Sequence, residues 1–134
     1  MSKPILCLDF DGVCHSYTSG WKGASVIPDP PVDGLFEFLM EAKEYFDIQI
    51  FSSRSNQPGG VVAMKEWFAH HYSEYVFRTR PELKERYSAF FCPEWLSFPL
   101  EKPAAFLTID DRAITFTGKW PDMDYMRGFK PWYK

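Results

Sequence analysis

The sequence is poor in the features that mark several common protein classes. Its three cysteines (Cys7, Cys14 and Cys92) include no CxxC pair, so neither a structural zinc site nor a disulfide framework is expected. No long apolar run is present, and the first short one carries Asp9, so we expect neither a signal peptide nor a membrane span. These absences favour a reduced, cytoplasmic protein with no membrane association.

A run of basic residues is also missing. Lys and Arg together number 15 against 18 Asp and Glu, which gives a net charge of −3. A protein built mainly to grip the backbone of nucleic acids needs a basic stripe or patch. That class is therefore disfavoured, whereas a nucleotide or a nucleic-acid end stays open as a substrate.

Apolar residues are abundant enough for a folded core. They make up 46% of the 134 residues, which argues against disorder and fits one domain over residues 1–134. Apolar runs alternate with helical patterns, and this order is typical of an α/β protein with a mostly parallel sheet. No internal repeat and no domain boundary are visible.

The pattern predicts each element by its range. We expect strands at residues 5–9, 47–51 and 105–109, with further short strands at 75–77 and 114–117. Helices are expected at 31–45 and 61–72, with a short one at 82–87. Residues 12–31 are rich in Gly and Pro and predict a long loop or small hairpin, too short for a separate cap domain.

Two pairs of acids directly follow predicted strands. Asp9 and Asp11 close the first apolar run, and Asp110 and Asp111 follow the run at 105–109. Ligands of open α/β sheets bind beyond the carboxyl ends of the strands, so these acids converge if the strands are neighbours. Clustered carboxylates repel one another unless a cation is present, and Mg²⁺ suits such a site. Acids after a strand are also a common turn and cap signal, which is the competing interpretation.

Polar residues follow the strand predicted at 47–51. The hydroxyl of Ser52 and free backbone amides near it suit phosphate oxygens. Ser53 and Arg54 are predicted to bind substrate on the same rim, since arginine makes bidentate phosphate contacts. The alternative is an ordinary solvated loop.

Three segments in order resemble the haloacid dehalogenase (HAD) superfamily of phosphohydrolases. LDFDGV at 8–13 is similar to its DxDG motif, IQIFS at 48–52 to its strand ending in Ser or Thr, and FLTIDD at 106–111 to its strand ending in acids. KPAAFLTIDDRA at 102–113 further resembles small capless members, including deoxyribonucleotidase-like and polynucleotide-phosphatase-like branches. The resemblance covers nearly the whole chain and implies a three-layer, Rossmann-like, mostly parallel sheet without a cap domain.

The resemblance also implies roles for these residues. Asp9 would be the nucleophile that forms an aspartyl-phosphate, and Asp11 would protonate the leaving oxygen and later activate water. Ser52 would hydrogen-bond a phosphoryl oxygen. Mg²⁺ would be held by the Asp9 carboxylate, the Asp11 backbone carbonyl and Asp110 or Asp111. The acid at position 11 favours phosphate-ester hydrolysis over dehalogenation.

A lysine would neutralise charge on the nucleophile and the phosphoryl group. Lys102 matches the KP position, and Lys84 is the alternative at a longer separation from Asp110. An extended strand rises roughly 3.3 Å per residue, so Lys102 reaches the site only if the chain approaches as a loop before a short strand. Pro103 permits this, and we favour Lys102.

Loop 12–31 holds further candidates beside the acids. Tyr17 and Trp21 could stack on a base, although packing of the loop onto the domain is the favoured interpretation. His15 is close to the acids and could contact substrate, although a surface histidine is the favoured interpretation. Arg112, after the second acid pair, is expected to pair with nearby carboxylates.

The sequence thus predicts a Mg²⁺-dependent phosphatase that acts on a phosphomonoester, such as a nucleotide, a nucleic-acid end or a small metabolite. The alternative is a non-catalytic phosphate-sensing module of the receiver type, although the DxD spacing and Ser52 fit it poorly. A metal-dependent nuclease is a third candidate, and the missing basic stripe counts against it. The natural substrate and the oligomeric state stay open.

Overall fold

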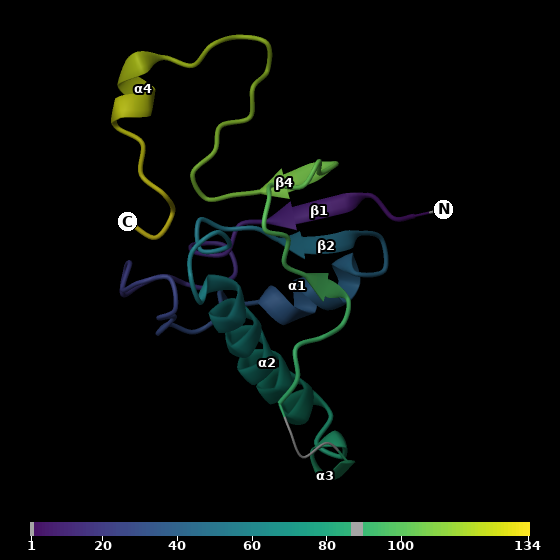
Figure 1. Cartoon of the computed structure of the whole chain (residues 1–134). Helices are drawn as coiled ribbons and strands as arrows, with labels where there is room; N and C mark the ends of the chain where they lie inside the picture. Colours follow the sequence, from purple (N-terminus) through teal and green to yellow (C-terminus); the bar gives the residue numbers. More distant parts are fainter. Residues whose placement is uncertain (1, 87–89) are drawn as a thin grey trace.

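A computed structural model describes residues 2–86 and 90–134 of the chain. It contains a four-stranded sheet in the order β3-β2-β1-β4, in which every pairing is parallel (Figure 1). The elements in chain order are β1 (Ile5–Leu8), α1 (Leu35–Ala42), β2 (Asp47–Ile50), α2 (Gly60–Thr79), α3 (Leu83–Arg86), β3 (Leu96–Ser97), β4 (Leu107–Ile109) and α4 (Met123–Arg127). The α/β character expected from the alternating pattern is confirmed.

Strand β1 lies in the middle of the sheet, between β2 and β4. Cys7 stands opposite Gln49 on one side and Thr108 on the other. The ladder continues just beyond the strands, because the Asp9 amide donates to the Ile109 carbonyl at 3.0 Å. The carboxyl ends of the strands all point the same way, to the left in Figure 1. The segments that carry the predicted site therefore leave adjacent strands at one edge of the sheet.

The hydrophobic core joins alternate residues of two strands to one face each of two helices. Alternation on a strand and three-to-four spacing on a helix bring such residues together. Its buried members from these elements are Leu6 and Leu8 of β1, Ile48 and Ile50 of β2, Leu35, Phe36, Leu39 and Ala42 of α1, and Met64, Trp67, Phe68 and Tyr72 of α2. Full burial of a large apolar side chain stabilises the fold by about 1.5–3 kcal/mol. This cluster holds the central strands, and hence the site at their ends, in place.

Two of the predicted strands are wrong. Residues 75–77 belong to α2, which continues to Thr79 because Tyr75 and Val76 still pack against the core. Residues 114–117 form no strand and lie in irregular chain beyond β4. The pattern also missed β3 and α4, which have two and five residues and therefore too little periodicity to detect.

The predicted helices are present with different ends. Helix α1 begins only at Leu35, because Gly34 before it has φ +84°, a left-handed conformation outside the helix. Helix α3 corresponds to the short helix predicted at 82–87, although Tyr87 lies outside the described residues. Residues 12–31 form a loop, with isolated bridges from His15 to Asp11 and to Pro31.

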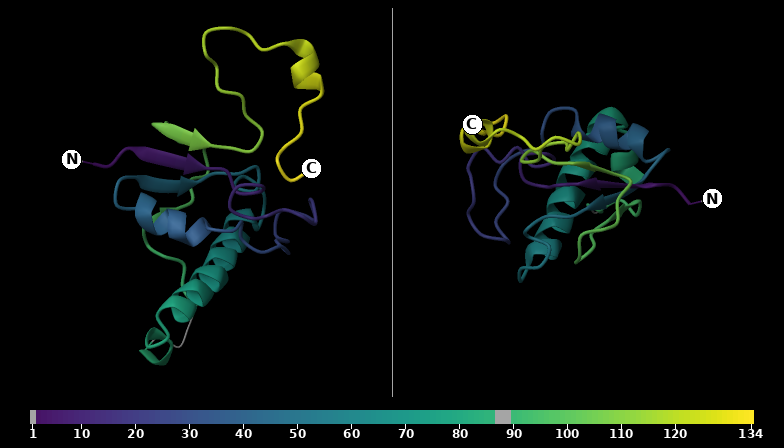
Figure 2. Two further views of the ribbon diagram at one scale, coloured as in Figure 1. Left: turned by 180° about the vertical axis from the view of Figure 1, so that it is seen from behind. Right: turned by 90° about the horizontal axis from the view of Figure 1, so that it is seen from above.

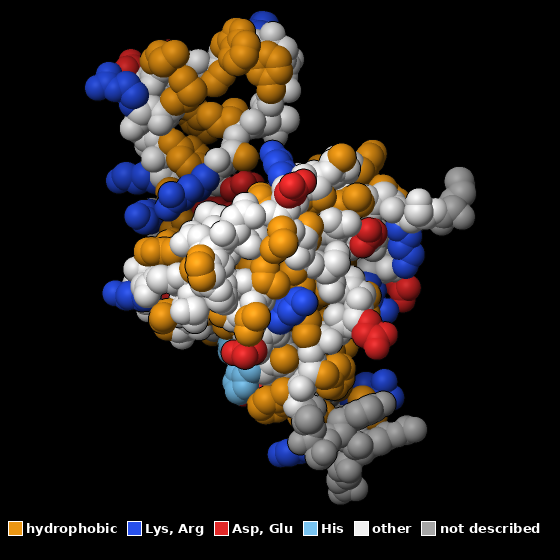
Figure 3. All heavy atoms as spheres, in the orientation of Figure 1, with side chains coloured by type: hydrophobic (Ala, Val, Ile, Leu, Met, Phe, Trp, Pro, Cys, Tyr) orange, Lys and Arg blue, Asp and Glu red, His pale blue; other side chains and the backbone are white. Residues whose placement is uncertain are grey.

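Residues 110–134 form an arm beyond β4 (Figure 2). The arm carries α4 and then returns, so that its last residues lie beside the carboxyl ends of the strands. Hydrophobic side chains gather on the arm in Figure 3, and Trp120 is the most exposed of them at 86%. Within the described ranges, no helix has the length and apolar character needed to cross a membrane.

Candidate functional site

Three acids from two neighbouring strand ends meet at the carboxyl edge of the sheet. Asp9 follows β1, and Asp110 and Asp111 follow β4. Each of the three can place a carboxylate oxygen within 4.8 Å of the other two. The side chain of Asp111 is only 3% exposed, although its residue lies at the start of the arm. The pairing of β1 with β4 therefore produces the convergence that the two acid pairs predicted.

This cluster disfavours the charged form of Asp9. Burial raises the pKa of Asp9 to about 8, and a hydrogen bond shared with Asp111 and the negative charge of Asp110 act in the same direction. A cation would remove this conflict. The ligands on offer are carboxylate oxygens, which a hard divalent ion such as Mg²⁺ prefers. The residues present thus fit the metal that the sequence predicted.

The carboxylate of Asp11 is not part of that cluster. Arg54 donates to it from Nε at 2.9 Å and from Nη2 at 3.1 Å, and the Nδ1 atom of His15 lies 2.9 Å from it. Burial alone would raise the pKa of Asp11, but the hydrogen bonds from His15 and Arg54 outweigh it and lower that pKa. Only the backbone of Asp11 is therefore free for the metal role predicted for this residue.

Arg54 does not stand at the rim as a free phosphate ligand. Its side chain has no exposed surface, and Nη1 donates to the carbonyls of Gly23, Ala24 and Val26 at 2.8, 2.9 and 3.2 Å. The substrate-binding role predicted for Arg54 is corrected accordingly. Its guanidinium ties loop 12–31 to Asp11, because a buried cation must be paired and hydrogen-bonded on all sides.

His15 is buried rather than exposed, which corrects the surface position expected for it. Its Nε2 accepts a hydrogen bond from the Asp29 amide at 3.1 Å, so in the neutral ring the proton is on Nδ1 and is donated to Asp11. The sequence offered one weak signal for this contact, a histidine four residues after Asp11. Only the folded loop brings the two side chains together.

The serines predicted at the phosphate site lie beside Asp9. Ser52 and Ser53 both line a pocket of about 140 Å³ together with Asp9, Asp11 and Asp111. The Ser52 hydroxyl accepts a hydrogen bond from the Arg54 amide at 3.1 Å, which fixes its direction at the end of β2. Ser53 is exposed and keeps its side chain available at the mouth of the pocket.

The structure brings one of the two candidate lysines to the acids. Lys102 lines a neighbouring pocket of about 210 Å³ together with Asp9, Ser52 and Asp110. It can do so because β4 begins only at Leu107 and the chain before it is irregular. Lys84 lies on α3, at the end of α2 that is remote from the strand ends (Figure 1).

Aromatic residues form the outer wall of the acid pocket. Tyr17, Trp21 and Tyr133 line it together with the acids and Arg112. Tyr133 comes from the end of the arm, and its hydroxyl donates to Asp111 at 2.8 Å. The sequence analysis did not assign Tyr133 to the site, because no local pattern relates it to Asp111.

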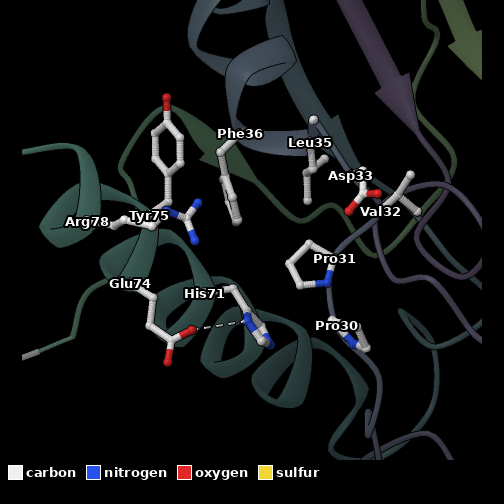
Figure 4. Close-up of a pocket in the computed structure, with 11 residues that line it drawn as sticks. Pro30, Pro31, Val32, Asp33, Leu35, Phe36, His71, Glu74, Tyr75 and Arg78 are labelled. Atoms are coloured by element: carbon white, nitrogen blue, oxygen red, sulfur yellow. Dashed lines mark ion pairs between the residues drawn. The ribbon is translucent and has the colours of Figure 1, made fainter.

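A larger hollow lies away from these acids. It has a volume of about 320 Å³ between residues 30–36 and α2, and its titratable side chains include Asp33, His71, Glu74 and Arg78 (Figure 4). Glu74 is already paired with His70 at 3.1 Å and approaches His71 at 3.8 Å. With the cation of Arg78 also in its lining, this hollow lacks the cluster of carboxylates that marks Asp9.

Comparison with known proteins assigns no family to this chain. No family model, no curated protein and no solved structure matches it. A function therefore rests on the residues of the site alone.

Proposed function

We propose that this chain is a Mg²⁺-dependent phosphohydrolase that cleaves a phosphomonoester through an aspartyl-phosphate on Asp9. The observation that carries the proposal is the set of carboxylates of Asp9, Asp110 and Asp111 within 4.8 Å of one another. Ser52 and Asp9 line both of the adjoining pockets that these acids border. Membership of the HAD superfamily, with a three-layer capless core, is part of the same proposal. Its support is the three motifs together with their position on the adjacent strands β2, β1 and β4.

Asp9, Asp110 and Asp111 would hold the metal, with the backbone carbonyl of Asp11 as a further ligand. When bound, Mg²⁺ supplies positive charge that offsets the repulsion between an anionic nucleophile and an anionic phosphate. Lys102 adds a cation on the other side of Asp9, where it shares a pocket with the nucleophile. Ser52 is placed to donate its hydroxyl proton to a phosphoryl oxygen.

The reaction proceeds in two steps at phosphorus. A carboxylate oxygen of Asp9 forms a bond to phosphorus while the bond to the leaving oxygen breaks, and the leaving oxygen takes a proton from the carboxyl group of Asp11. Water then attacks the phosphorus of the aspartyl-phosphate, gives its proton to a base, and releases phosphate with Asp9 regenerated. The lowered pKa of Asp11 suits the second step, in which a deprotonated carboxylate must accept that proton.

Because its pKa is lowered, Asp11 is rarely protonated and is a poor proton donor in the first step. Leaving groups that need little protonation should therefore react much faster than alkoxides. We expect aryl phosphates to be hydrolysed with a higher kcat than alkyl phosphates. Comparable rates for both classes would contradict this account of Asp11.

The test is a hydrolysis assay of wild-type protein and Asp9→Asn, with Mg²⁺ and with EDTA. The substrate panel contains aryl and alkyl phosphates, nucleotides, and oligonucleotides phosphorylated at either end. We expect wild-type turnover that needs Mg²⁺, and no turnover by Asp9→Asn above the protein-free background. Asp124→Asn, the same change at an exposed position on the arm, is the matched control and should keep full activity.

Trapping of the intermediate separates the proposal from its competitors. Acid quench during turnover should recover phosphate bound to wild-type protein and none bound to Asp9→Asn. Phosphate release without a trapped intermediate would favour activated-water chemistry of the nuclease type. A phospho-aspartate that persists without releasing phosphate would instead indicate a receiver-type module.

A further inference from the structure

A second hollow, which we call the aromatic cleft, adjoins the acid pocket. The cleft has a volume of about 440 Å³ and is lined by Tyr17, Thr18, Ser19, Gly20, Trp21, Arg112, Tyr133 and Lys134. Tyr17, Trp21, Arg112 and Tyr133 also line the acid pocket, so the two spaces share a wall. The acid pocket, at about 140 Å³, falls below the roughly 300–1,000 Å³ typical of ligand pockets, whereas the cleft lies within that range.

Trp21 presents one ring face to solvent. The guanidinium carbon of Arg54 lies 4.7 Å from the centroid of the Trp21 ring, and Arg54 itself is fully buried, so it covers the inner face. Trp21 is nevertheless 45% exposed, which leaves the outer face open. The indole of Trp21 is thus held in a fixed orientation by the Arg54 cation on one face, and its other face is available for stacking.

Loop 12–31 does not need this indole in order to stay attached. Arg54 anchors it through the carbonyls of Gly23, Ala24 and Val26. Asp29 accepts two further hydrogen bonds from Ser19, at 2.8 Å from its amide and at 2.6 Å from its hydroxyl. The loop is therefore fixed by polar contacts, and the exposed face of Trp21 is left unexplained by packing.

The two tyrosines of the cleft are also held in place. Their rings meet edge to face with centroids 5.8 Å apart. Tyr17 has φ +62°, and among the described residues other than glycine it alone has a positive φ. Such a backbone conformation is costly for a residue with a side chain and is found preferentially where a loop clamps a ligand. Tyr133 is oriented by its hydrogen bonds with Asp111 and Arg112.

We propose that the aromatic cleft binds the base of a nucleoside whose phosphomonoester enters the acid pocket. The substrate class is then a nucleotide, either free or at the end of a nucleic acid, and this inference rests on the proposed function. Base–aromatic stacking is tolerant of base identity, which suits an open ring face such as that of Trp21. Arg112 and Lys134 add positive charge on the side from which an anionic substrate would arrive.

The separation of the two spaces favours a nucleotide over a phosphotyrosine. An aromatic ring bonded directly to the phosphoryl oxygen would have to lie within the small acid pocket itself. A sugar between phosphate and base instead carries the ring into the adjoining cleft. The shared wall of the two hollows matches this second arrangement.

The test measures binding, so that it does not depend on turnover. Calorimetric titration of Asp9→Asn in Mg²⁺ would compare nucleoside 5′- and 3′-monophosphates, short oligonucleotides with a terminal phosphate, ribose 5-phosphate and O-phosphotyrosine. We expect the ligands with a base to bind about 5- to 150-fold more tightly than ribose 5-phosphate, the range that alanine substitution of a stacking side chain gives. If mononucleotides bind more tightly than oligonucleotides, the ligand is a free nucleotide. The opposite order identifies the end of a nucleic acid.

Variants then test the platform itself. Trp21→Ala in the same background should abolish the preference for a base, because it weakens nucleotide binding about 5- to 150-fold more than ribose 5-phosphate binding, whereas Trp21→Phe should retain most of the preference. Trp120→Ala, which removes an exposed indole far along the arm, is the matched control and should change nothing. A melting curve of each variant checks that the fold is intact.

Several results would overturn the inference. They are equal affinity for nucleotides and ribose 5-phosphate, no measurable nucleotide binding, tighter binding of O-phosphotyrosine, or an equal loss of all ligands in Trp21→Ala. Hydrolysis without any preference for a base would refute base binding in the aromatic cleft and leave the proposed phosphatase activity supported. Base-dependent binding without hydrolysis by wild-type protein would support base binding and refute the phosphatase activity.

Discussion

At the scale of single residues, two carboxylates only two positions apart have opposite electrostatic environments. Asp9 faces two further acids, and its pKa is raised to about 8. Asp11 faces Arg54 and His15, which hold its pKa below the usual value despite burial. Groups whose environments separate their pKa values in this way are suited to different chemical roles. The difference arises because Asp9 still pairs with the chain at the end of β4, whereas Asp11 already bridges to His15 in the loop.

The raised pKa of Asp9 predicts how the stability of the metal-free protein depends on pH. Its folded-state pKa of about 8 exceeds the unfolded value of roughly 3.9, so the folded state binds the proton more tightly. The contribution of Asp9 to the free energy of unfolding is therefore fully present below about pH 4. It is lost as the pH rises to 8, by at most about 1.4 kcal/mol per pH unit. Asp9→Asn removes the ionisation and should melt at a higher temperature than wild type.

The measurement is thermal unfolding in EDTA at pH 5, 7 and 9. The advantage of Asp9→Asn over wild type should grow with pH. Asp124→Asn is the control, because that side chain is 91% exposed and should give a small, pH-independent difference. An advantage of Asp9→Asn that stays constant from pH 5 to 9 would contradict the shifted pKa.

At the scale of elements, one arginine joins the end of β2 to the loop that follows β1. Arg54 is fully buried and contacts both Asp11 and three carbonyls of loop 12–31. Helix α2 begins close behind, since a side chain on Gly60 would collide with the Arg54 carbonyl. The loop, β2 and α2 are thus tied together at one point beneath the proposed site.

Replacement of this arginine should destabilise the fold strongly. Arg54→Met removes the cation paired with the Asp11 carboxylate and the guanidinium donor to three loop carbonyls, and removal of one partner from a buried ion pair costs about 3–5 kcal/mol. Arg54→Lys should also destabilise, because one ammonium group cannot reproduce the planar fork of donors. Urea denaturation gives the free energy of unfolding of each variant.

Arg127→Met serves as the matched control for that series. Arg127 is 82% exposed on the arm and approaches only Asp124, at 3.9 Å. Surface changes of this kind usually stay within about 0.5 kcal/mol. If Arg54→Met cost no more than Arg127→Met, the anchoring role of Arg54 would be refuted.

At the scale of the whole molecule, the last residues of the arm close onto the first turn of the chain. Trp132 donates from Nε1 to the Gly12 carbonyl at 2.7 Å, and Tyr133 bonds Asp111. The chain passes so close that a side chain at Gly12 would collide with both Asp111 and Tyr133. Gly12 also has φ +81°, a conformation that glycine adopts without strain.

Two glycine variants separate backbone strain from this close approach. Gly12 and Gly20 have similar positive φ values, +81° and +74°, but nothing lies within 4 Å of a side chain built on Gly20. Gly20→Ala should lower the free energy of unfolding by about 1–2 kcal/mol, because alanine is strained in the left-handed backbone conformation. Gly12→Ala should cost more and should also release the end of the arm.

Limited trypsin digestion after Arg127, which Gly128 follows, reports on that release. Cleavage there should be faster in Gly12→Ala than in Gly20→Ala or wild type, and chemical denaturation supplies the matching free energies of unfolding. Equal cleavage rates and equal free energies in the two variants would show that the arm does not depend on Gly12.

Several features were determined by the sequence itself. Short apolar runs placed β1, β2 and β4, because a short run of apolar residues bounded by turn residues is a local pattern. The acids and Ser52 were assigned to strand ends for the same reason, and the parallel order then brought Asp9, Asp110 and Asp111 together. Strand β3 and helix α4 left no such pattern and were missed.

Only the tertiary structure decided how the site is enclosed. Arg54 reaches Asp11 across 43 positions, and Trp132 reaches Gly12 across 120. No periodicity encodes such contacts, since they depend on the path of loop 12–31 and of the arm through space. The burial of His15, the loss of Arg54 as a free phosphate ligand and the place of Tyr133 at the acids all follow from those paths. The sequence determined which groups stand at the strand ends, and long-range packing decided which of them face the pocket.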